Sequence, residues 1–180
     1  MKYFKTTYSS VIGTITLASD GEHIVGLWNE KQKYHGDEMY KDMVIKDDLI
    51  IFDHVKKWLD QYFNGEKPRI EELDIVLNGT AFQKEVWDIL ISIPYGEVIT
   101  YKDIAEKIAK KHNKKSMSAQ AVGGAVGHNP ISIIIPCHRV VGTNKSLTGY
   151  AGGIKSKIKL LELEGVDISL YTIPKKEMSF

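Results

Sequence analysis

The residues best suited to covalent chemistry are the only cysteine of the chain, Cys137, and the histidine that follows it, His138. A thiolate is a strong nucleophile, and a basic neighbour lowers the pKa of a thiol. A cysteine buried among apolar side chains instead behaves as a small hydrophobic residue with a raised pKa. The pair alone fits both a reactive thiol and a core residue, so the flanking segments must decide.

The segment before the thiol predicts how Cys137 is positioned. Ile133, Ile134 and Ile135 form a β-branched run that predicts a buried strand. Pro136 cannot donate a hydrogen bond to a sheet, so the strand is expected to end there. The thiol is therefore expected at the end of a rigid element.

Two helices are expected ahead of this strand, after a boundary near residues 78–79. Thr80 and Gln83 form a capping box, and the helix that they open is expected to end before Pro94. Thr100 is expected to cap a second helix with Asp103 in its first turn. A third helix follows the basic linker 110–115, which suggests a helix-turn-helix, although many helical pairs bind nothing.

The third helix, which begins near Ser116 or Ser118, carries almost no side chains. Residues 119–127 are all small or glycine apart from Gln120 and two valines. Each glycine costs a helix about 1 kcal/mol relative to alanine, so something must come close to this backbone. Tight packing against another helix and close approach to a narrow DNA groove both explain the composition.

Beyond the thiol, a glycine-rich loop at residues 148–153 leads into a helix expected from Ile154 to about Glu164. Lys155, Lys157 and Lys159 are expected to form a solvated face of that helix. Residues 166–180 lack a clear pattern and are expected to be a loose tail.

The first half is predicted to mix sheet and helix. Strands are expected over 11–18 and 23–28, joined by an Asp-Gly hairpin signal, with a possible third over 72–77. Apolar spacing predicts a helix over 49–63. This half shows no cluster of residues suited to catalysis. Its three histidines are isolated in the sequence and are expected at the surface or in hydrogen bonds: His23, His35 and His54.

Composition sets further bounds. The chain has 180 residues, 43% of them hydrophobic and 26% charged, which is typical of a soluble globular protein. One cysteine excludes internal disulfides and multi-cysteine zinc sites, and it favours a reducing cytoplasm. Neither a signal-peptide core nor a membrane-spanning run is expected. The net charge of +1 means that affinity for nucleic acid must come from a local patch.

The ordered motifs around the thiol resemble those of the O6-alkylguanine-DNA alkyltransferase family. They are Gly123-Gly124-Ala125, His128-Asn129-Pro130, Pro136-Cys137-His138-Arg139-Val140 and Gly149-Tyr150-Ala151-Gly152-Gly153. The likeness is strong over residues 79–165 and weaker at 12–14 and 17–21. It implies an α/β two-domain fold: a ribonuclease-H-like sheet-plus-helix domain over 1–78, a mostly helical domain with a winged-helix-like helix-turn-helix over 79–168, and a tail over 169–180.

The resemblance also implies a reaction. Cys137 would take the alkyl group from O6-alkylguanine, and also from O4-alkylthymine, in one irreversible step after the base is flipped from the stack. His138 would be the base, acting through a water, and Glu164 would orient and polarise its imidazole. Asn129 would tie the recognition helix to the active-site segment. Arg139 is expected to be structural.

Further roles follow from the same resemblance. Tyr101 would contact a phosphate and protonate guanine N3, and Tyr150 would stack on the flipped base. The pocket would be completed by Pro136, Val140, Ala151, Gly152 and Lys157, and DNA would be contacted by Lys114, Lys115, Gln120, Ala121, Gly123 and Gly124. The chain departs from the family at Gln120, where an inserted arginine is usual, so we expect weaker binding or slower flipping.

The expected partner is double-stranded DNA carrying O6-alkylguanine, with no membrane, cofactor or metal. The protein is expected to be a monomer, with cooperative binding to DNA left open. Three rival functions are a damage sensor without chemistry, a transcription regulator and a cysteine hydrolase. Cys137 argues against the sensor, and the chain shows no added regulatory module. Hydrolysis requires turnover that a permanently alkylated thiol does not allow.

Overall fold

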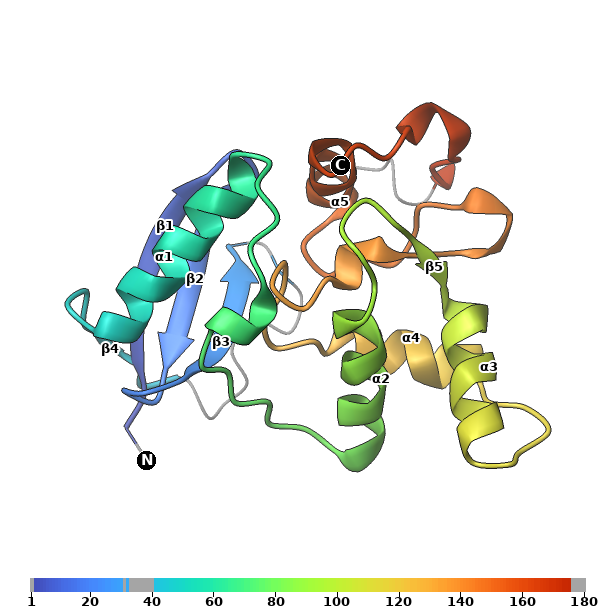
Figure 1. Ribbon diagram of the computed structural model, residues 1–180, viewed down its shortest axis with the longest axis horizontal. Helices are drawn as coiled ribbons and strands as arrows, with labels where there is room; N and C mark the ends of the chain where they lie inside the picture. Colours follow the sequence, from blue (N-terminus) through green and yellow to red (C-terminus); the bar gives the residue numbers. More distant parts are fainter. Residues whose placement is uncertain (1, 31, 33–40, 176–180) are drawn as a thin grey trace.

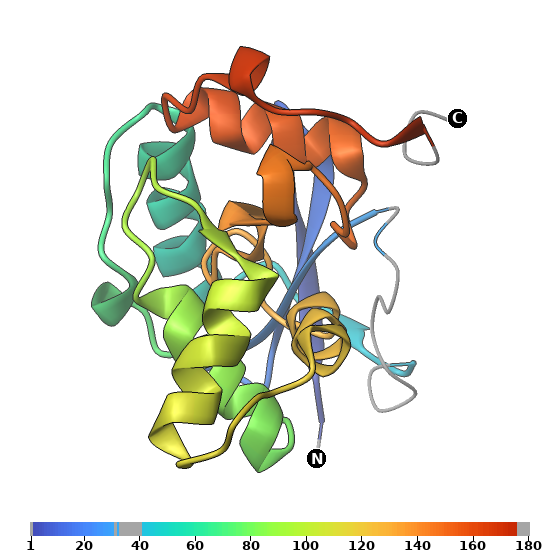
Figure 2. The ribbon, with the colours of Figure 1, turned by 90° about the vertical axis from the view of Figure 1, so that its right-hand side faces the viewer.

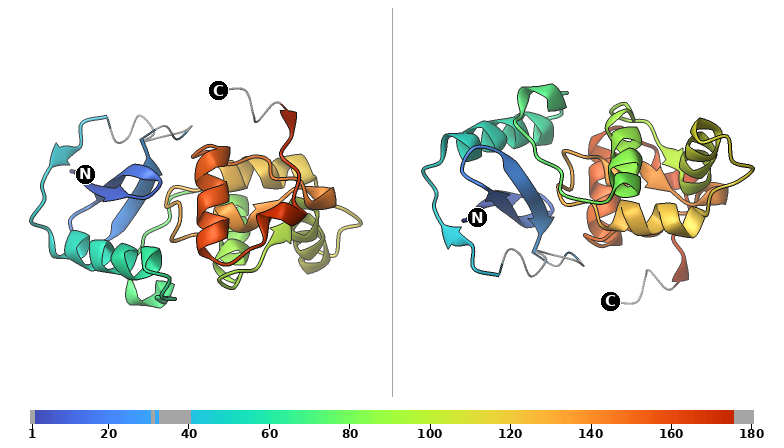
Figure 3. Two further views of the ribbon diagram at one scale, coloured as in Figure 1. Left: turned by 90° about the horizontal axis from the view of Figure 1, so that it is seen from above. Right: turned by 90° about the horizontal axis from the view of Figure 1, so that it is seen from below.

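The computed structural model describes residues 2–30, 32 and 41–175. The chain forms two halves that lie side by side (Figure 1). One half holds a sheet with one helix, and the other holds the remaining helices and the cysteine segment. The views from above and below in Figure 3 show the same division, with the chain crossing between the halves.

The first half is a four-stranded sheet of order β3-β2-β1-β4, formed by β1 (Phe4–Ser10), β2 (Gly13–Ser19), β3 (Ile24–Asn29) and β4 (Val44–Ile45). β1–β2 and β2–β3 pair antiparallel, and β1–β4 pair parallel. Helix α1 (Ile50–Phe63) packs its apolar stripe on this sheet. The two predicted strands and the helix are confirmed, whereas β1 and β4 were not predicted.

The strand expected over residues 72–77 is wrong. A 3₁₀-helix occupies Ile70–Glu72, and only Ile75 then bridges to Ile24 of β3. Val76 donates its backbone N–H to Ile24, which in turn donates to Asp74. Two glutamates and an aspartate in the segment favour a turn and leave too short an apolar run for a strand.

The helices of the second half begin where their caps predict. α2 (Ala81–Ile91) opens with the expected capping box of Thr80 and Gln83, and α3 (Tyr101–Lys111) opens with the expected cap Thr100, which also forms a capping box with Asp103. Ser118 caps the third helix, α4 (Ala119–Gly127). α4 packs against both α2 and α3, and Figure 2 shows α3 and α4 on one side of the molecule, below α5 (Ile154–Leu163).

The isoleucine strand is the main error of the sequence interpretation. Residues 131–135 form a tight turn in which Ile135 donates to the carbonyl of Ile131, and Ile133 adopts a positive φ of 72°. A β-branched residue rarely adopts this conformation, so tertiary contacts must impose it. Leu27 of β3 forms a single bridge with Ile131, which fixes the start of the turn against the sheet.

The cysteine segment is regular only over short stretches. Cys137–Arg139 form a 3₁₀-helix, and β6 (Val140–Val141) then pairs parallel with β5 (Ile99–Thr100), directly before α3. Thr143–Lys145 form a tight turn in which Asn144 and Lys145 adopt positive φ values of 57° and 56°. The active-site segment is therefore joined by hydrogen bonds to the start of the helix-turn-helix.

One apolar core extends through both halves. The largest buried cluster contains Leu17 and Phe52 from the first half together with Trp87, Ile104 and Cys137 from the second. No helix among the described residues is both long and apolar enough to cross a membrane.

The prediction of a loose tail is wrong for residues 166–173. Ile168–Leu170 form a 3₁₀-helix, and Val166, Ile168, Tyr171 and Ile173 pack against a smaller buried cluster around Leu147 and Leu161. Leu147 also donates its backbone N–H to Thr172. Residues 176–180 of the predicted tail, and His35, lie outside the described residues.

Candidate active site

Cys137 is the only cysteine and lies in the buried 3₁₀-helix, with 3% of its surface exposed. Its pKa is raised because burial disfavours the thiolate, and hydrogen bonds with the side chains of Asn129 and Ser132 oppose that rise. The resting thiol is therefore neutral at pH 7. It needs a base before it can act as a nucleophile.

Asn129 joins α4 to the thiol segment. Its Nδ2 donates to the carbonyl of Ile135 over 2.8 Å, and its Oδ1 accepts from the N–H of Ile131 over 3.0 Å. The residue follows the end of α4 directly and is 3% exposed. Asn129 therefore fixes the end of α4 to the turn that leads to Cys137.

His138 and Arg139 both contact the carboxylate of Glu164. His138 Nε2 lies 2.6 Å from Glu164 Oε1, and both side chains are fully buried. Arg139 donates from Nε to Oε2 over 2.8 Å and from Nη2 to Oε1 over 3.0 Å. Its Nη1 donates to the carbonyl of Ile93, so Arg139 holds the carboxylate in one orientation.

Tyr62 brings a group from the first half into this network. Its hydroxyl donates to Glu164 Oε1 over 2.7 Å and lies 3.3 Å from His138 Nε2, while the backbone N–H of Gly96 donates to Oε2. Burial opposes ionisation of Glu164, but the contacts with His138 and Arg139 hold its pKa far below its ordinary value. The first half therefore does contribute chemistry, contrary to the sequence prediction.

A signal for Tyr62 was present in the sequence. It follows Val55 and Leu59 on the buried face of α1, and a buried tyrosine hydroxyl requires a hydrogen-bond partner. Its partner, however, is 102 residues away along the chain. No local pattern identifies a partner at that separation.

The contact with Glu164 determines which nitrogen of His138 is basic. A carboxylate accepts only, so Nε2 must carry the hydrogen, and Nδ1 keeps the free electron pair. Nδ1 is buried and has no hydrogen-bond partner among the described residues. Burial lowers the pKa of His138, although Glu164 opposes this effect. The imidazole is therefore neutral at pH 7 and able to accept a proton.

The glycine-rich loop is held by two side chains that the resemblance assigned to the substrate. The hydroxyl of Tyr101 donates to the carbonyls of Gly149 and Thr148 over 3.0 and 3.3 Å. Lys157 Nζ donates to the carbonyls of Val140 and Thr148. Lys157 is fully buried, so the predicted solvated lysine face is wrong at this position.

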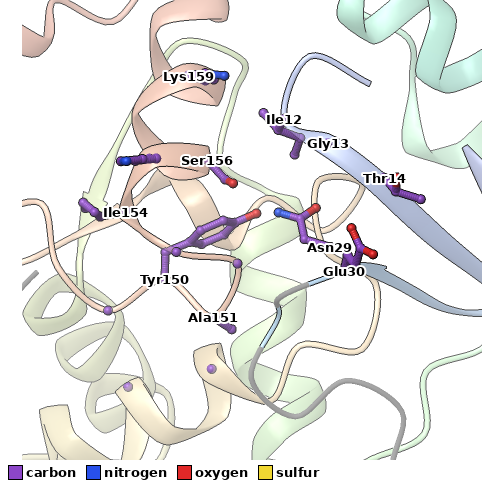
Figure 4. A pocket seen from close by; sticks show the side chains of 16 residues that line it. Ile12, Gly13, Thr14, Asn29, Glu30, Tyr150, Ala151, Ile154, Ser156 and Lys159 are labelled. Carbon is purple, nitrogen blue, oxygen red and sulfur yellow. The ribbon is translucent and has the colours of Figure 1, made fainter. Parts of the chain in front are cut away.

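A pocket of about 950 Å³ opens between the two halves (Figure 4). Its wall includes four residues assigned to substrate or DNA from the sequence: Gly123, Tyr150, Ala151 and Gly152. Tyr101, Pro136, Val140 and Lys157 do not line it. Cys137 does not line it either, but the thiol interacts electrostatically with Tyr150, which does. The first half adds Asn29 and Glu30, which the sequence did not indicate.

The exposed face of α4 is nearly free of side chains. Gln120, Ala121 and Gly124 are exposed, and Gly123 is partly so. A Cβ added at Gly124 would meet no atom within 4 Å, and one at Gly123 would meet only an ordinary contact with Tyr101. Packing within the chain therefore does not require these glycines. Lys114 and Lys115 are exposed in the turn before the helix.

The site combines a buried thiol, a neutral imidazole next to it in the sequence, and an exposed helix of small residues in a helix-turn-helix. These features fit a class of protein that binds DNA and acts on it with a cysteine nucleophile. Comparison with known families agrees. Residues 3–76 match the ribonuclease-like domain of 6-O-methylguanine DNA methyltransferase, and residues 81–166 match its DNA binding domain. The chain belongs to this family, and its activity is that of a methylated-DNA–protein-cysteine methyltransferase.

Individual relatives cover nearly the whole chain. The methylated-DNA–protein-cysteine methyltransferase of Haemophilus influenzae is 41% identical over 163 residues, covering 91% of this chain and 87% of that protein. The one from Methanosarcina acetivorans is 43% identical, covering 88% and 96%. A crystal structure of Mycobacterium tuberculosis OGT in complex with DNA matches with a TM-score of 0.77 and 38% identity, covering 95% of each chain.

Proposed function

We propose that the protein repairs duplex DNA by moving the alkyl group of O6-alkylguanine irreversibly to the sulfur of Cys137. The observation that carries this proposal is the buried imidazole of His138, whose Nε2–H is bound by Glu164 and whose Nδ1 is free. This is the arrangement of an activated nucleophile: a nucleophile, a base and a group that orients the base.

The reaction is a single displacement. Through one bridging water, Nδ1 of His138 takes the proton of the thiol, and Glu164 stabilises the imidazolium that forms. The sulfur attacks the alkyl carbon, a C–S bond forms, and the bond from that carbon to O6 breaks with its electron pair going to guanine. The guanine then takes up a proton at N3, the role proposed for Tyr101. The thioether has no leaving group, so each molecule acts once.

The target base must leave the helical stack, because the alkylated oxygen is hidden inside duplex DNA. We assign docking to the α3–α4 pair, with the exposed face of α4 in the minor groove and Lys114 and Lys115 near phosphates. Gln120 would occupy the gap left by the base. Ribonuclease-H-like and winged-helix-like are the finer fold types that we propose for the two halves.

Remaining substrate contacts are assigned by position. Tyr150, Ala151 and Gly152 line the pocket and would form the wall next to the base. Pro136, Val140 and Lys157 do not line the pocket and would support its wall from the protein interior. Lys157 does so by donating to the carbonyls of Val140 and Thr148, which holds the glycine-rich loop in place. The same pocket would take O4-alkylthymine, whose alkylated oxygen presents the same bond to the sulfur.

We also propose that the protein is a monomer. Sedimentation with and without duplex DNA measures its oligomeric state.

The test mixes the protein with excess duplex DNA carrying O6-methylguanine and follows both intact mass and methyl release. We expect one methyl group per protein, located on Cys137 by peptide mapping, and no further turnover. Cys137→Ser should still bind the duplex but remove no methyl group. Multiple turnover, a methyl group on another residue, or undiminished repair by Cys137→Ser would each contradict the proposal.

A further inference from the structure

The pocket has a polar corner that the first half of the chain supplies. Asn29, the last residue of β3, is 4% exposed, and neither Nδ2 nor Oδ1 has a hydrogen-bond partner among the described residues. The buried hydroxyl of Tyr150 has none there either. Figure 4 shows the amide of Asn29 and the hydroxyl of Tyr150 pointing toward one another. Buried polar atoms are almost always paired with protein, ordered water or a ligand, so these atoms are available to pair with a group that enters the pocket.

This corner lies close to the reactive sulfur. The side chain of Gln32 accepts hydrogen bonds from the backbone N–H of Asn29 and from the hydroxyl of Ser132. Ser132 in turn is hydrogen-bonded to the thiol of Cys137. A Cβ at Gly152 would lie 2.6 Å from Asn29 Nδ2, so the loop touches the amide directly. Asn29 is therefore linked through Gln32 and Ser132 to the thiol, which lies behind the wall of the pocket.

The direction of attack decides which part of a substrate meets this wall. An in-line displacement places the alkyl carbon between O6 and the sulfur. Any further atoms of a longer adduct extend sideways from that carbon, into the wall around the thiol. A methyl group has no such atoms, so it does not reach the corner.

We propose that Asn29 is a specificity-determining residue that favours hydroxyalkyl adducts of guanine O6 over alkyl adducts of the same size. The inference rests on the proposed function. The amide offers both a donor and an acceptor, and a hydroxyl group can pair with both and with Tyr150.

The test compares two isosteric adducts. Single-turnover transfer is measured on duplexes carrying O6-(2-hydroxyethyl)guanine, O6-propylguanine or O6-methylguanine. Asn29→Leu keeps the approximate size of the side chain but removes its polar atoms. We expect this variant to lower the ratio of the hydroxyethyl to the propyl rate roughly tenfold, which corresponds to one hydrogen bond, and to leave the methyl rate within about twofold.

Thr14→Val is the matched control, because Thr14 lines the same pocket on the neighbouring strand (Figure 4). It should leave the ratio unchanged. Asn29→Leu should not lower the melting temperature, because the buried amide loses no protein partner. If this variant does not fold, Asn29→Ala supplies the same ratio.

An unchanged ratio in a variant that still transfers methyl groups overturns the role of Asn29. Equal losses on all three adducts together with a lower melting temperature would show a structural role and also overturn it. Absence of methyl transfer by the unmodified protein refutes the proposed function itself, so the two failures are distinguishable.

Discussion

Glu164 is the residue on which the chemistry of the site converges. A buried carboxylate is costly unless it is hydrogen-bonded and paired with a cation, and here it accepts from Tyr62, Gly96, His138 and Arg139. These contacts keep it ionised next to the imidazole. In the proposed mechanism, this negative charge would stabilise the imidazolium formed when the thiol loses its proton.

At this scale we predict that Tyr62→Phe slows alkyl transfer several-fold and lowers the free energy of unfolding by about 1.5–3 kcal/mol, the range for a hydrogen bond to a charged group. Urea unfolding and single-turnover assays measure the two effects. Tyr95→Phe is the matched control, because that hydroxyl donates to the neutral carbonyl of Leu163. Its loss should be about 0.5–1.5 kcal/mol. Equal effects of the two variants would contradict the role of Tyr62.

The same groups predict how stability depends on pH. His138 has a lowered pKa when folded, so the unfolded chain binds its proton first as the pH falls below about 6.5. Glu164 also has a lowered pKa, so its contribution is present above its ordinary range and is lost as the pH falls through and below that range. Both effects destabilise the fold in acid. Urea melts between pH 8 and 4 should show a stability that begins to fall near pH 6.5 and continues to fall toward pH 4, and a constant stability down to pH 5 would refute the assignment to His138.

At the scale of elements, the glycines of α4 lower the stability of this helix but leave its backbone accessible. Its buried side carries Val122, Ala125 and Val126, while its exposed side carries glycines that no neighbour in the chain requires. Asn129 then connects the end of this helix to the thiol turn. The helix is thereby suited to approach DNA closely and to hold the thiol segment in register with it.

We predict that Gly124→Ala raises the free energy of unfolding by about 0.5–1 kcal/mol, because alanine is the better helix former and finds open space. The same methyl group should weaken duplex binding, since it keeps the backbone away from the groove. Fluorescence anisotropy and urea melts measure both quantities. The control is Gln61→Ala on the exposed side of α1, which should not change DNA affinity. Unchanged affinity in Gly124→Ala would contradict the close approach of this face of α4 to DNA.

Gln120→Arg should strengthen binding to duplex DNA and speed repair, because the added charge lies on the face proposed to enter the groove. The slope of log affinity against log salt should steepen by about one unit. Gln61→Arg adds the same charge on α1 and is the matched control. If both variants behave alike, or if neither affinity nor rate changes in Gln120→Arg, then Gln120 does not fill the gap.

At the scale of the whole molecule, the two halves share a core and a reaction site. The main apolar cluster extends across both, Leu27 of the sheet bridges to Ile131, and Tyr62 reaches Glu164. Lys159 also donates to the carbonyl of Val11. The sheet half is therefore part of the catalytic structure, because removing it would expose the buried network.

Alkylation should weaken this shared core. Cys137 belongs to the main cluster and is 3% exposed, so an added methyl group must displace packed neighbours. We predict that the methylated protein is less stable by about 1–3 kcal/mol, the usual cost of overpacking. Urea melts before and after reaction with O6-methylguanine DNA measure the loss, and Cys137→Ser treated in the same way should show none. Equal stability of the two forms would show that the pocket already has room for the methyl group.

Local signals predicted most elements correctly and failed where distant contacts decide. The caps at Thr80 and Thr100 located two helices, because a cap needs only residues within one turn. The run Ile133–Ile135 read as a strand, but it lies in a turn fixed by Asn129 and by the bridge from Leu27. Lys157 read as solvated because helical periodicity does not reveal which carbonyls lie nearby.

The amino-acid sequence by itself indicated the family and pointed to Cys137 and His138 as the proposed nucleophile and base, since the two are adjacent and the surrounding motifs are specific to one family. Only the tertiary structure showed that Tyr62 completes the network at Glu164 and that Asn29 lines the pocket. The physical reason is that both residues act through contacts between the halves. Such contacts depend on how the sheet packs against the helices of the other half, and local sequence preferences do not predict that packing.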